Sequence, residues 1–234
     1  MVINIIKIKP AFAQGYGAAK RGFTLIEMLV VVGIFAVVAT ILLFNYSDFS
    51  TAVGIRNLAA EIGLSTRKAQ TYATGVHVIN GTNGIMSDTF PAYGISFSTN
   101  STSAHTYDPS VSNFVLFVDA APNGDKVTSN TYDNNGTCGA PGVGQECVEN
   151  FGFTGGDTVV SLCTDIPNPN TCLTPATGGI VNVLFHRPNP DAVICVDGID
   201  CSTRTASYVK VTIQSPKGVQ RIITIWNTGQ VSVN

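Results

Sequence analysis

The sequence predicts an α+β fold in which one long N-terminal helix packs on an antiparallel β-sheet domain. Residues 23–44 are almost entirely apolar, apolar residues at helical spacing continue to about residue 75, and short β-branched or aromatic runs follow. The chain has 234 residues, of which 44% are hydrophobic and 12% charged. This composition excludes a disordered protein and allows one sizeable domain with an appendage.

The apolar run at 23–44 is long enough to cross a membrane. As a helix, its 22 residues would span about 33 Å, compared with roughly 30 Å for a hydrocarbon core. All the charges that precede it are positive: Lys7, Lys9, Lys20 and Arg21. The positive-inside rule therefore predicts a single-pass inner-membrane protein with a cytoplasmic N-terminus and an exported C-terminal part.

An ordinary cleavable secretory signal is the competing interpretation of the N-terminus. Residues 11–13 have the small-x-small pattern of a signal peptidase site. However, Lys7, Lys9 and Pro10 interrupt the short apolar stretch before that site, and the better apolar run has no such site behind it. The pattern therefore favours an uncleaved or differently processed membrane helix.

Glu27 is the one charged residue of the apolar run. A carboxylate in a membrane helix costs roughly 2.5–3.5 kcal/mol on insertion scales, so such residues are functional candidates. Cleavage between Gly22 and Phe23 would create a positively charged α-amino group at Phe23. Between two staggered helices, this amine and the Glu27 carboxylate of a neighbour could pair, and a misaligned neighbour would leave both charges buried and alone. Glu27 is thus predicted to set the register of assembly.

The segment Lys20-Arg21-Gly22-Phe23-Thr24-Leu25-Ile26-Glu27, followed by an apolar helix, resembles the class III leader of type IV pilins and type II secretion pseudopilins. In that family a prepilin peptidase cleaves after the glycine and methylates the new N-terminal residue. The resemblance implies that Gly22 ends the leader, that Phe23 is N-methylated and that Glu27 is the assembly carboxylate. It implies the ladle-like pilin fold, and as partners the peptidase, other pilin or pseudopilin subunits and inner-membrane lipid.

The predicted domain organisation follows from these segments: a cleaved leader (1–22), a transmembrane helix (23–44), its amphipathic continuation (45–75) and an extracytoplasmic β-rich head (76–234).

Removing the four basic residues of the leader leaves nine basic and 15 acidic residues, a formal charge of −6. Phosphate contacts need clustered Lys and Arg, so we expect no nucleic-acid partner.

The amphipathic continuation is indicated by apolar or small residues three and four positions apart, from Ile55 through Leu58, Ile62, Ser65 and Ala69 to Tyr72 and Val76. Strands are expected at 76–80, 92–98, 113–119, 155–162, 179–187, 191–197, 206–214, 219–226 and 231–233. Residues 93–98, 114–125 and 224–233 are similar to the H-type minor pseudopilins and their pilus counterparts.

Six cysteines all follow the membrane run, which in an exported domain favours disulfides. Fifteen pairings are possible, and the spacing suggests three local loops: Cys138–Cys147, Cys163–Cys172 and Cys195–Cys201. A zinc site would need closely spaced Cys pairs or Cys/His clusters, which the sequence lacks.

Asp119, Asn123 and Asp125 form a candidate calcium loop, because oxygen-bearing side chains surround an Asn-Gly turn. The spacing is not that of an EF-hand, and Asp and Asn are common in turns for conformational reasons. No other cofactor is expected.

The sequence contains no G-x-S-x-G, H-E-x-x-H or P-loop motif, and His77, His105 and His186 are scattered, so we expect no enzyme.

The first hypothesis is a structural subunit, minor rather than major, of a type IV pilus or type II secretion pseudopilus that forms a filament through its N-terminal helix. The alternative is a single-pass anchored extracytoplasmic binding protein or enzyme that never assembles, in which Glu27 would be incidental. The residue at the mature N-terminus discriminates between the two.

Overall fold

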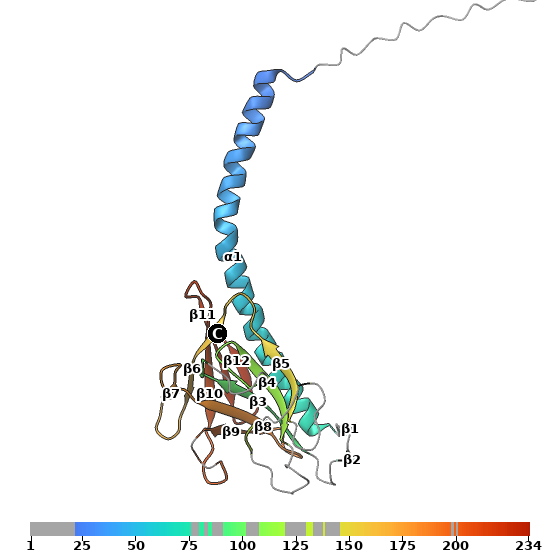
Figure 1. Ribbon diagram of the computed structural model, residues 1–234, viewed down its shortest axis with the longest axis vertical. Coiled ribbons are helices and arrows are strands. Elements are labelled where there is room, and N and C mark those ends of the chain that lie inside the picture. The colour runs from blue at the N-terminus through green and yellow to red at the C-terminus, as the bar shows by residue number, and fades with distance from the viewer. Residues whose placement is uncertain are drawn as a thin grey trace, which may run out of the picture. The chain divides into compact units, whose positions relative to one another are not determined.

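The computed structural model describes residues 22–75, 80–81, 84–85, 91–101, 108–119, 130–132, 138, 146–197, 199 and 201–234. The chain forms two compact units, and the boundary between them falls between Asn45 and Tyr46. One helix, α1 (Leu25–Thr74, 50 residues), contributes to both units (Figure 1). A single long helix over this range is what the apolar pattern predicts.

The first unit is the membrane-length part of α1. Its large apolar side chains are exposed all around the helix, as expected for a segment whose solvent is lipid rather than water. Thr40 is the other polar side chain besides Glu27 between Leu25 and Leu43, and its hydroxyl donates a hydrogen bond of 2.7 Å to the carbonyl oxygen of Ala36. This part of the helix therefore leaves little polar surface to solvate.

The second unit contains two five-stranded antiparallel sheets. The first follows the order β12-β11-β10-β6-β7 and the second the order β5-β4-β3-β8-β9. A separate two-stranded hairpin joins β1 and β2. The strands are β1 (Asn80–Gly81), β2 (Gly84–Ile85), β3 (Ala92–Ser98), β4 (Asn113–Asp119), β5 (Cys147–Gly152), β6 (Thr158–Thr164), β7 (Thr171–Leu173), β8 (Ile180–Phe185), β9 (Ala192–Val196), β10 (Tyr208–Gln214), β11 (Gln220–Trp226) and β12 (Val231–Val233).

The second half of α1 packs on the sheets through the apolar face that its sequence predicts. Its buried residues join one core cluster with residues of both sheets, such as Phe114 of β4 and Val211 of β10. Burying each large apolar side chain contributes about 1.5–3 kcal/mol, so this face fixes the helix on the head. The buried helix residues are Ile55, Leu58, Ala59, Ile62, Ser65, Thr66, Ala69 and Ala73.

Among the described residues, two ion pairs join α1 to the head at its surface. Lys68 Nζ lies 2.5 Å from Glu149 Oε2 on β5, and Lys217 Nζ lies 2.7 Å from Asp48 Oδ1. The hydrogen bond to Glu149 raises the pKa of Lys68 above its ordinary value. Exposed pairs of this kind contribute at most about 1 kcal/mol each, so the apolar core outweighs them.

The strands β3 and β4 are buried on both faces. On β4, Phe114, Leu116 and Val118 face the core shared with α1, whereas Val115 and Phe117 belong to a second apolar cluster with Leu184 and others. Burial on both faces explains why the strand sequences NFVLFVD and AYGISFS lack a regular polar alternation.

Three disulfides close local loops: Cys138–Cys147, Cys163–Cys172 and Cys195–Cys201. They are the three pairs that the spacing suggests, and no cysteine is left free. The two cysteines of each pair are 9, 9 and 6 residues apart in sequence, respectively. On the loop-entropy model each bridge stabilises the fold by roughly 2–3 kcal/mol.

The structure also differs from the strand prediction. The strands β5 and β7 were not expected, because Glu149 and Asn150 break the apolar pattern of β5 and β7 has only three residues. Residues 155–157 form a turn rather than the start of a strand, since Gly155 and Gly156 both have positive φ. Of the predicted strand at 76–80, residues 76–79 lie outside the described residues.

Candidate processing and assembly site

The predicted processing site lies just before the helix. Gly22, Phe23 and Thr24 have no regular secondary structure, and α1 begins at Leu25. Phe23 has 76% of its side chain exposed, and a Cβ placed on Gly22 would meet no atom within 4 Å. The bond between Gly22 and Phe23 is therefore in an open segment outside the helix, where a peptidase can reach it.

Thr24 and Glu27 form a capping box at the start of α1. The Thr24 hydroxyl accepts a hydrogen bond of 3.2 Å from the Glu27 backbone N–H. In return, Glu27 Oε2 accepts hydrogen bonds from the Thr24 backbone N–H at 3.3 Å and from the Thr24 hydroxyl at 3.2 Å. The box satisfies backbone donors that the first turn of a helix otherwise leaves unpaired, and it places a negative charge at the positive end of the helix dipole.

The capping box leaves one oxygen of Glu27 available. Within the described chain, Oε1 accepts no hydrogen bond, and the side chain is exposed. The carboxylate can therefore hold its own helix terminus through Oε2 and still accept a cationic donor from outside through Oε1.

Thr24 has a role that the sequence analysis did not assign to it. The signal was present, because a Thr followed three residues later by Glu and then by an apolar run is the sequence pattern of a capping box.

The other predicted site residues lie elsewhere. Asp119 is buried at the end of β4, and its Oδ2 accepts a hydrogen bond of 3.0 Å from the backbone N–H of Asn130. Asn123 and Asp125 lie outside the described residues, so calcium binding stays a prediction. His186 is half-buried, and burial lowers its pKa, whereas His77 and His105 also lie outside the described residues.

Replacing Thr24 should loosen the start of α1. Thr24→Val keeps the shape of the side chain and removes the hydroxyl, so we expect a loss of about 1 kcal/mol of capping energy. In detergent micelles, amide hydrogen exchange at Glu27 and Met28 should become about fivefold faster. Thr24→Ser should exchange at the wild-type rate, and so should Thr40→Val at these two amides. Equal rates in Thr24→Val and wild type would show that the box does not hold the helix terminus.

Comparison with known proteins identifies this N-terminal segment. Residues 17–43 match the family model described as the prokaryotic N-terminal methylation motif. Comparison with curated proteins and with solved structures gives no match for the chain. The matched motif is the class III leader of type IV pilins and pseudopilins and the cleavage site of prepilin peptidase, so it implies that peptidase and pilin-type subunits as partners. With the apolar helix, it indicates a single-pass, membrane-anchored protein of the structural pilin type.

Proposed function

We propose that this protein, which carries the class III leader of type IV pilins and pseudopilins, is a minor structural subunit of a type IV pilus or type II secretion pseudopilus. In this function the leader stays cytoplasmic until prepilin peptidase cuts after Gly22. The exported head, which begins after the membrane-spanning part of α1, is carried into a filament as the helices pack together. We propose no enzymatic activity for the head.

The single observation that carries this proposal is the free oxygen of Glu27 one helical turn from the cleavage point. Cleavage would expose a positively charged amine at Phe23, and a neighbouring subunit could bring its amine to Oε1. In a surrounding of low dielectric, the pair is much stronger than in water, and a misaligned neighbour leaves two unpaired charges. Apolar helix faces leave lipid only for partners against which they pack well, so like helices are the natural neighbours.

The minor role is supported by the similarity of residues 93–98, 114–125 and 224–233 to the H-type minor pseudopilins. The competing function is an anchored extracytoplasmic binding protein or enzyme that does not assemble. No observation on the described residues favours it specifically over the filament subunit.

The mature N-terminus tests the proposed function. We expect mass spectrometry of the protein purified from its native membrane to show a chain that begins with N-methylated Phe23. The Gly22→Ala variant is the control with the smallest change, and Gly22→Glu should block cleavage and leave the leader attached. An intact leader in the wild-type protein, or a cut near Ala13, would contradict the filament subunit and support the anchored protein.

A further inference from the structure

We propose that the end of the head at which α1 enters it binds the phospholipid headgroups of the membrane that anchors the chain. The contact combines the rings of Tyr46 and Phe49 with Lys217 at the tip of the β10–β11 hairpin. The inference goes beyond the proposed function, because it needs only that residues 23–44 cross a membrane. It therefore applies to a filament subunit and to an anchored protein alike.

The distance from the apolar run places this end of the head at the level of the headgroups. The 22 residues of the run span about 33 Å as a helix, which fills a hydrocarbon core of roughly 30 Å. Tyr46 and Phe49 follow its last residue by two and five positions, or about 3 and 7.5 Å of helix. The headgroup layer on each side of the core is about 5–7.5 Å thick. Both rings therefore fall within that layer.

The two rings point away from the core of the head. Tyr46 and Phe49 are 69% and 68% exposed, and they lie three positions apart on one side of α1. Ile55 lies about 180° around the helix from Tyr46 and is fully buried. Tyrosine is enriched at membrane–water interfaces because its ring is apolar and its hydroxyl polar, and phenylalanine packs at the boundary with the acyl chains. These exposed rings are thus typical of an interfacial belt.

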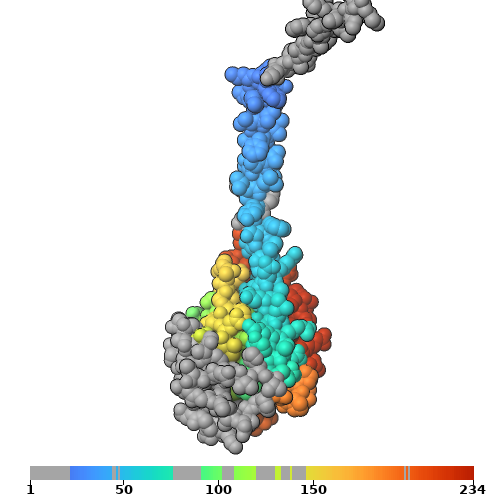
Figure 2. All heavy atoms as spheres, turned by 90° about the vertical axis from the view of Figure 1, so that its right-hand side faces the viewer, coloured from blue at the N-terminus to red at the C-terminus, as the bar shows by residue number. Residues whose placement is uncertain are grey.

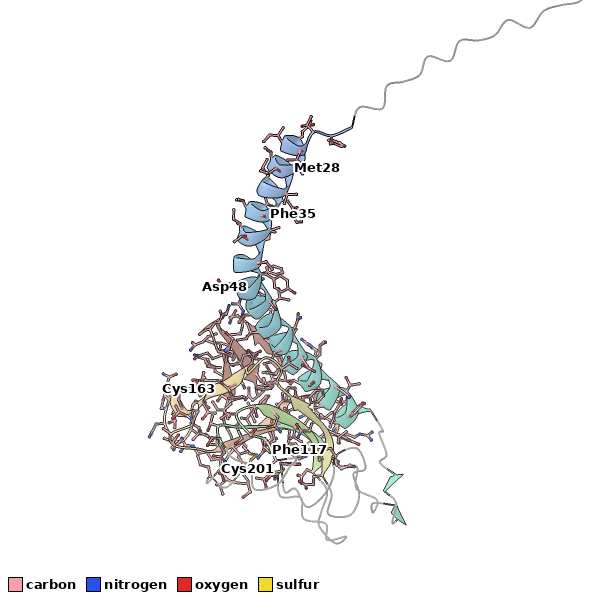
Figure 3. All side chains as sticks on the ribbon, turned by 45° about the horizontal axis from the view of Figure 1, so that its top comes forward. Met28, Phe35, Asp48, Phe117, Cys163 and Cys201 are labelled. Atoms are coloured by element: carbon pink, nitrogen blue, oxygen red, sulfur yellow. A yellow bond between two sulfur atoms is a disulfide. The ribbon has the colours of Figure 1, made fainter. Side chains whose placement is uncertain are left out.

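The tip of the β10–β11 hairpin reaches the same level on the opposite side of α1. Lys217 Nζ lies 2.7 Å from Oδ1 of Asp48, which follows the apolar run by four positions, about 6 Å of helix. Asp48 lies about 200° around the helix from Tyr46, and Figure 3 labels it. A backbone hydrogen bond of 2.9 Å from the Gly218 N–H to the carbonyl oxygen of Ser215 holds the turn that carries the lysine. The rings and the hairpin therefore flank the point at which α1 leaves the lipid.

The turn between β5 and β6 lies beside the hairpin tip. A Cβ on Gly156 would lie 3.1 Å from Cγ of Pro216. Residues 154–156 are exposed, and Figure 2 shows the segment around 150–157, in yellow, at the end of the head where α1 enters it. The carboxylate of the next residue, Asp157, is buried. The turn thus surrounds the hairpin lysine with small, uncharged residues that allow a close approach to a surface.

The charge at the hairpin tip is opposite to that of lipid phosphate. Without its leader the chain has a formal charge of −6, yet residues 202–234, which include β10–β12, contain four basic and no acidic residues. Lys217 keeps 41% of its side chain exposed while it pairs with Asp48. A lysine at headgroup level can donate to phosphate oxygens and is attracted to anionic lipid. Charge and position therefore both favour a phospholipid surface as the partner.

Quenching of tryptophan fluorescence by lipid tests the contact. Trp226 is the only tryptophan of the chain, so Trp226→Phe gives a background in which Thr154→Trp places a reporter on the exposed turn. The full-length chain is reconstituted in vesicles of phosphatidylcholine and phosphatidylglycerol, with a nitroxide on some headgroups. We expect strong quenching of the Thr154→Trp reporter. Trp226 of the wild-type protein should hardly be quenched, since it lies eight residues, roughly 26 Å of strand, from Gly218.

Changes of charge make the test specific. In the reporter background, Lys217→Glu should lower the quenching about fivefold, because one basic residue at an anionic surface shifts the contact equilibrium by about that factor. Asp48→Asn breaks the same ion pair but keeps the lysine, so quenching should be at least as strong as in the unchanged reporter protein. Lys210→Glu makes the same change of charge away from the tip and should leave the quenching unchanged.

Three results would overturn the inference. One is a Thr154→Trp reporter quenched no more than Trp226, and another is a loss of quenching as large in Asp48→Asn as in Lys217→Glu. The third is a blue-shifted reporter that lipid does not quench, which would indicate a protein partner at this end of the head. None of these results bears on the mature N-terminus, which tests the proposed function separately.

Discussion

Glu27→Leu should abolish incorporation of this protein into filaments while leaving membrane insertion and leader cleavage intact. Leucine removes the roughly 2.5–3.5 kcal/mol that a carboxylate costs in the membrane, so the variant should insert at least as well as wild type. It also removes the one carboxylate between residues 23 and 44, the group proposed to bind a neighbour's amine. An amine buried without its partner costs about 3–5 kcal/mol, which lowers incorporation by more than about 100-fold.

A second variant separates the two roles of Glu27. Glu27→Gln keeps an acceptor for the Thr24 hydroxyl and loses the negative charge, so it should retain slow amide exchange at the helix start and still fail to assemble. Filaments sheared from cells and probed with an antibody to the head give the measurement, with total membrane protein as the reference. If Glu27→Leu filaments grow at the wild-type rate and length, the register role of Glu27 is wrong.

Gly94→Ala should destabilise the head much more than Gly152→Ala, the glycine-to-alanine change at the end of β5. Gly94 lies in β3, between β4 and β8. A Cβ there would lie 2.7 Å from the carbonyl oxygen of Val183 and 2.9 Å from the ring of Phe117. The backbone on one side and a fully buried ring on the other leave little room for adjustment. We expect a loss of about 3 kcal/mol, or roughly 10 °C in melting temperature.

The matched control for Gly94→Ala is Gly152→Ala at the end of β5. A Cβ on Gly152 meets nothing within 4 Å, and its backbone is not in the left-handed region, so the melting temperature should stay the same or rise slightly. Thermal unfolding of the full-length protein in detergent, followed by near-ultraviolet circular dichroism, measures both variants. A Gly94→Ala protein as stable as Gly152→Ala would mean that β3 and β4 do not pack as closely as the structure indicates.

Local features of the sequence predicted the helix and most strands because each depends on the residues within it. The apolar run at 23–44 and the 3–4 spacing from Ile55 to Ala69 predicted one long helix, and the structure has this helix ending at Thr74. The runs at 92–98 and 113–119 match β3 and β4 to the residue, since β-branched and aromatic residues fill both faces of these buried strands. Figure 3 labels Phe117, one of these strand side chains, among the side chains of the head.

Two of the four edge strands of the five-stranded sheets, β5 and β7, were not predicted, whereas β9 and β12 were. An edge strand is covered on fewer sides, so its sequence needs fewer apolar residues, and β5 and β7 accordingly lack a regular apolar pattern. Strand β5 pairs with β4 across more than 25 residues of chain, and the three-residue strand β7 is held to β6 by the cross-strand pair Cys163–Cys172. Such pairings depend on tertiary contacts that no local window of sequence contains.

The sequence by itself determined the apolar helix of membrane length, the cleavage motif, the lone charge of Glu27 within that helix and the α+β class, because charge, apolar length and periodicity act locally along the chain. Only the tertiary structure decided that the strands form two sheets around one helix face, that Gly94 must lack a side chain, and that Glu27 keeps one oxygen free. These features depend on which distant groups meet, since close packing and hydrogen-bond geometry are set by the assembled fold rather than by neighbours in sequence.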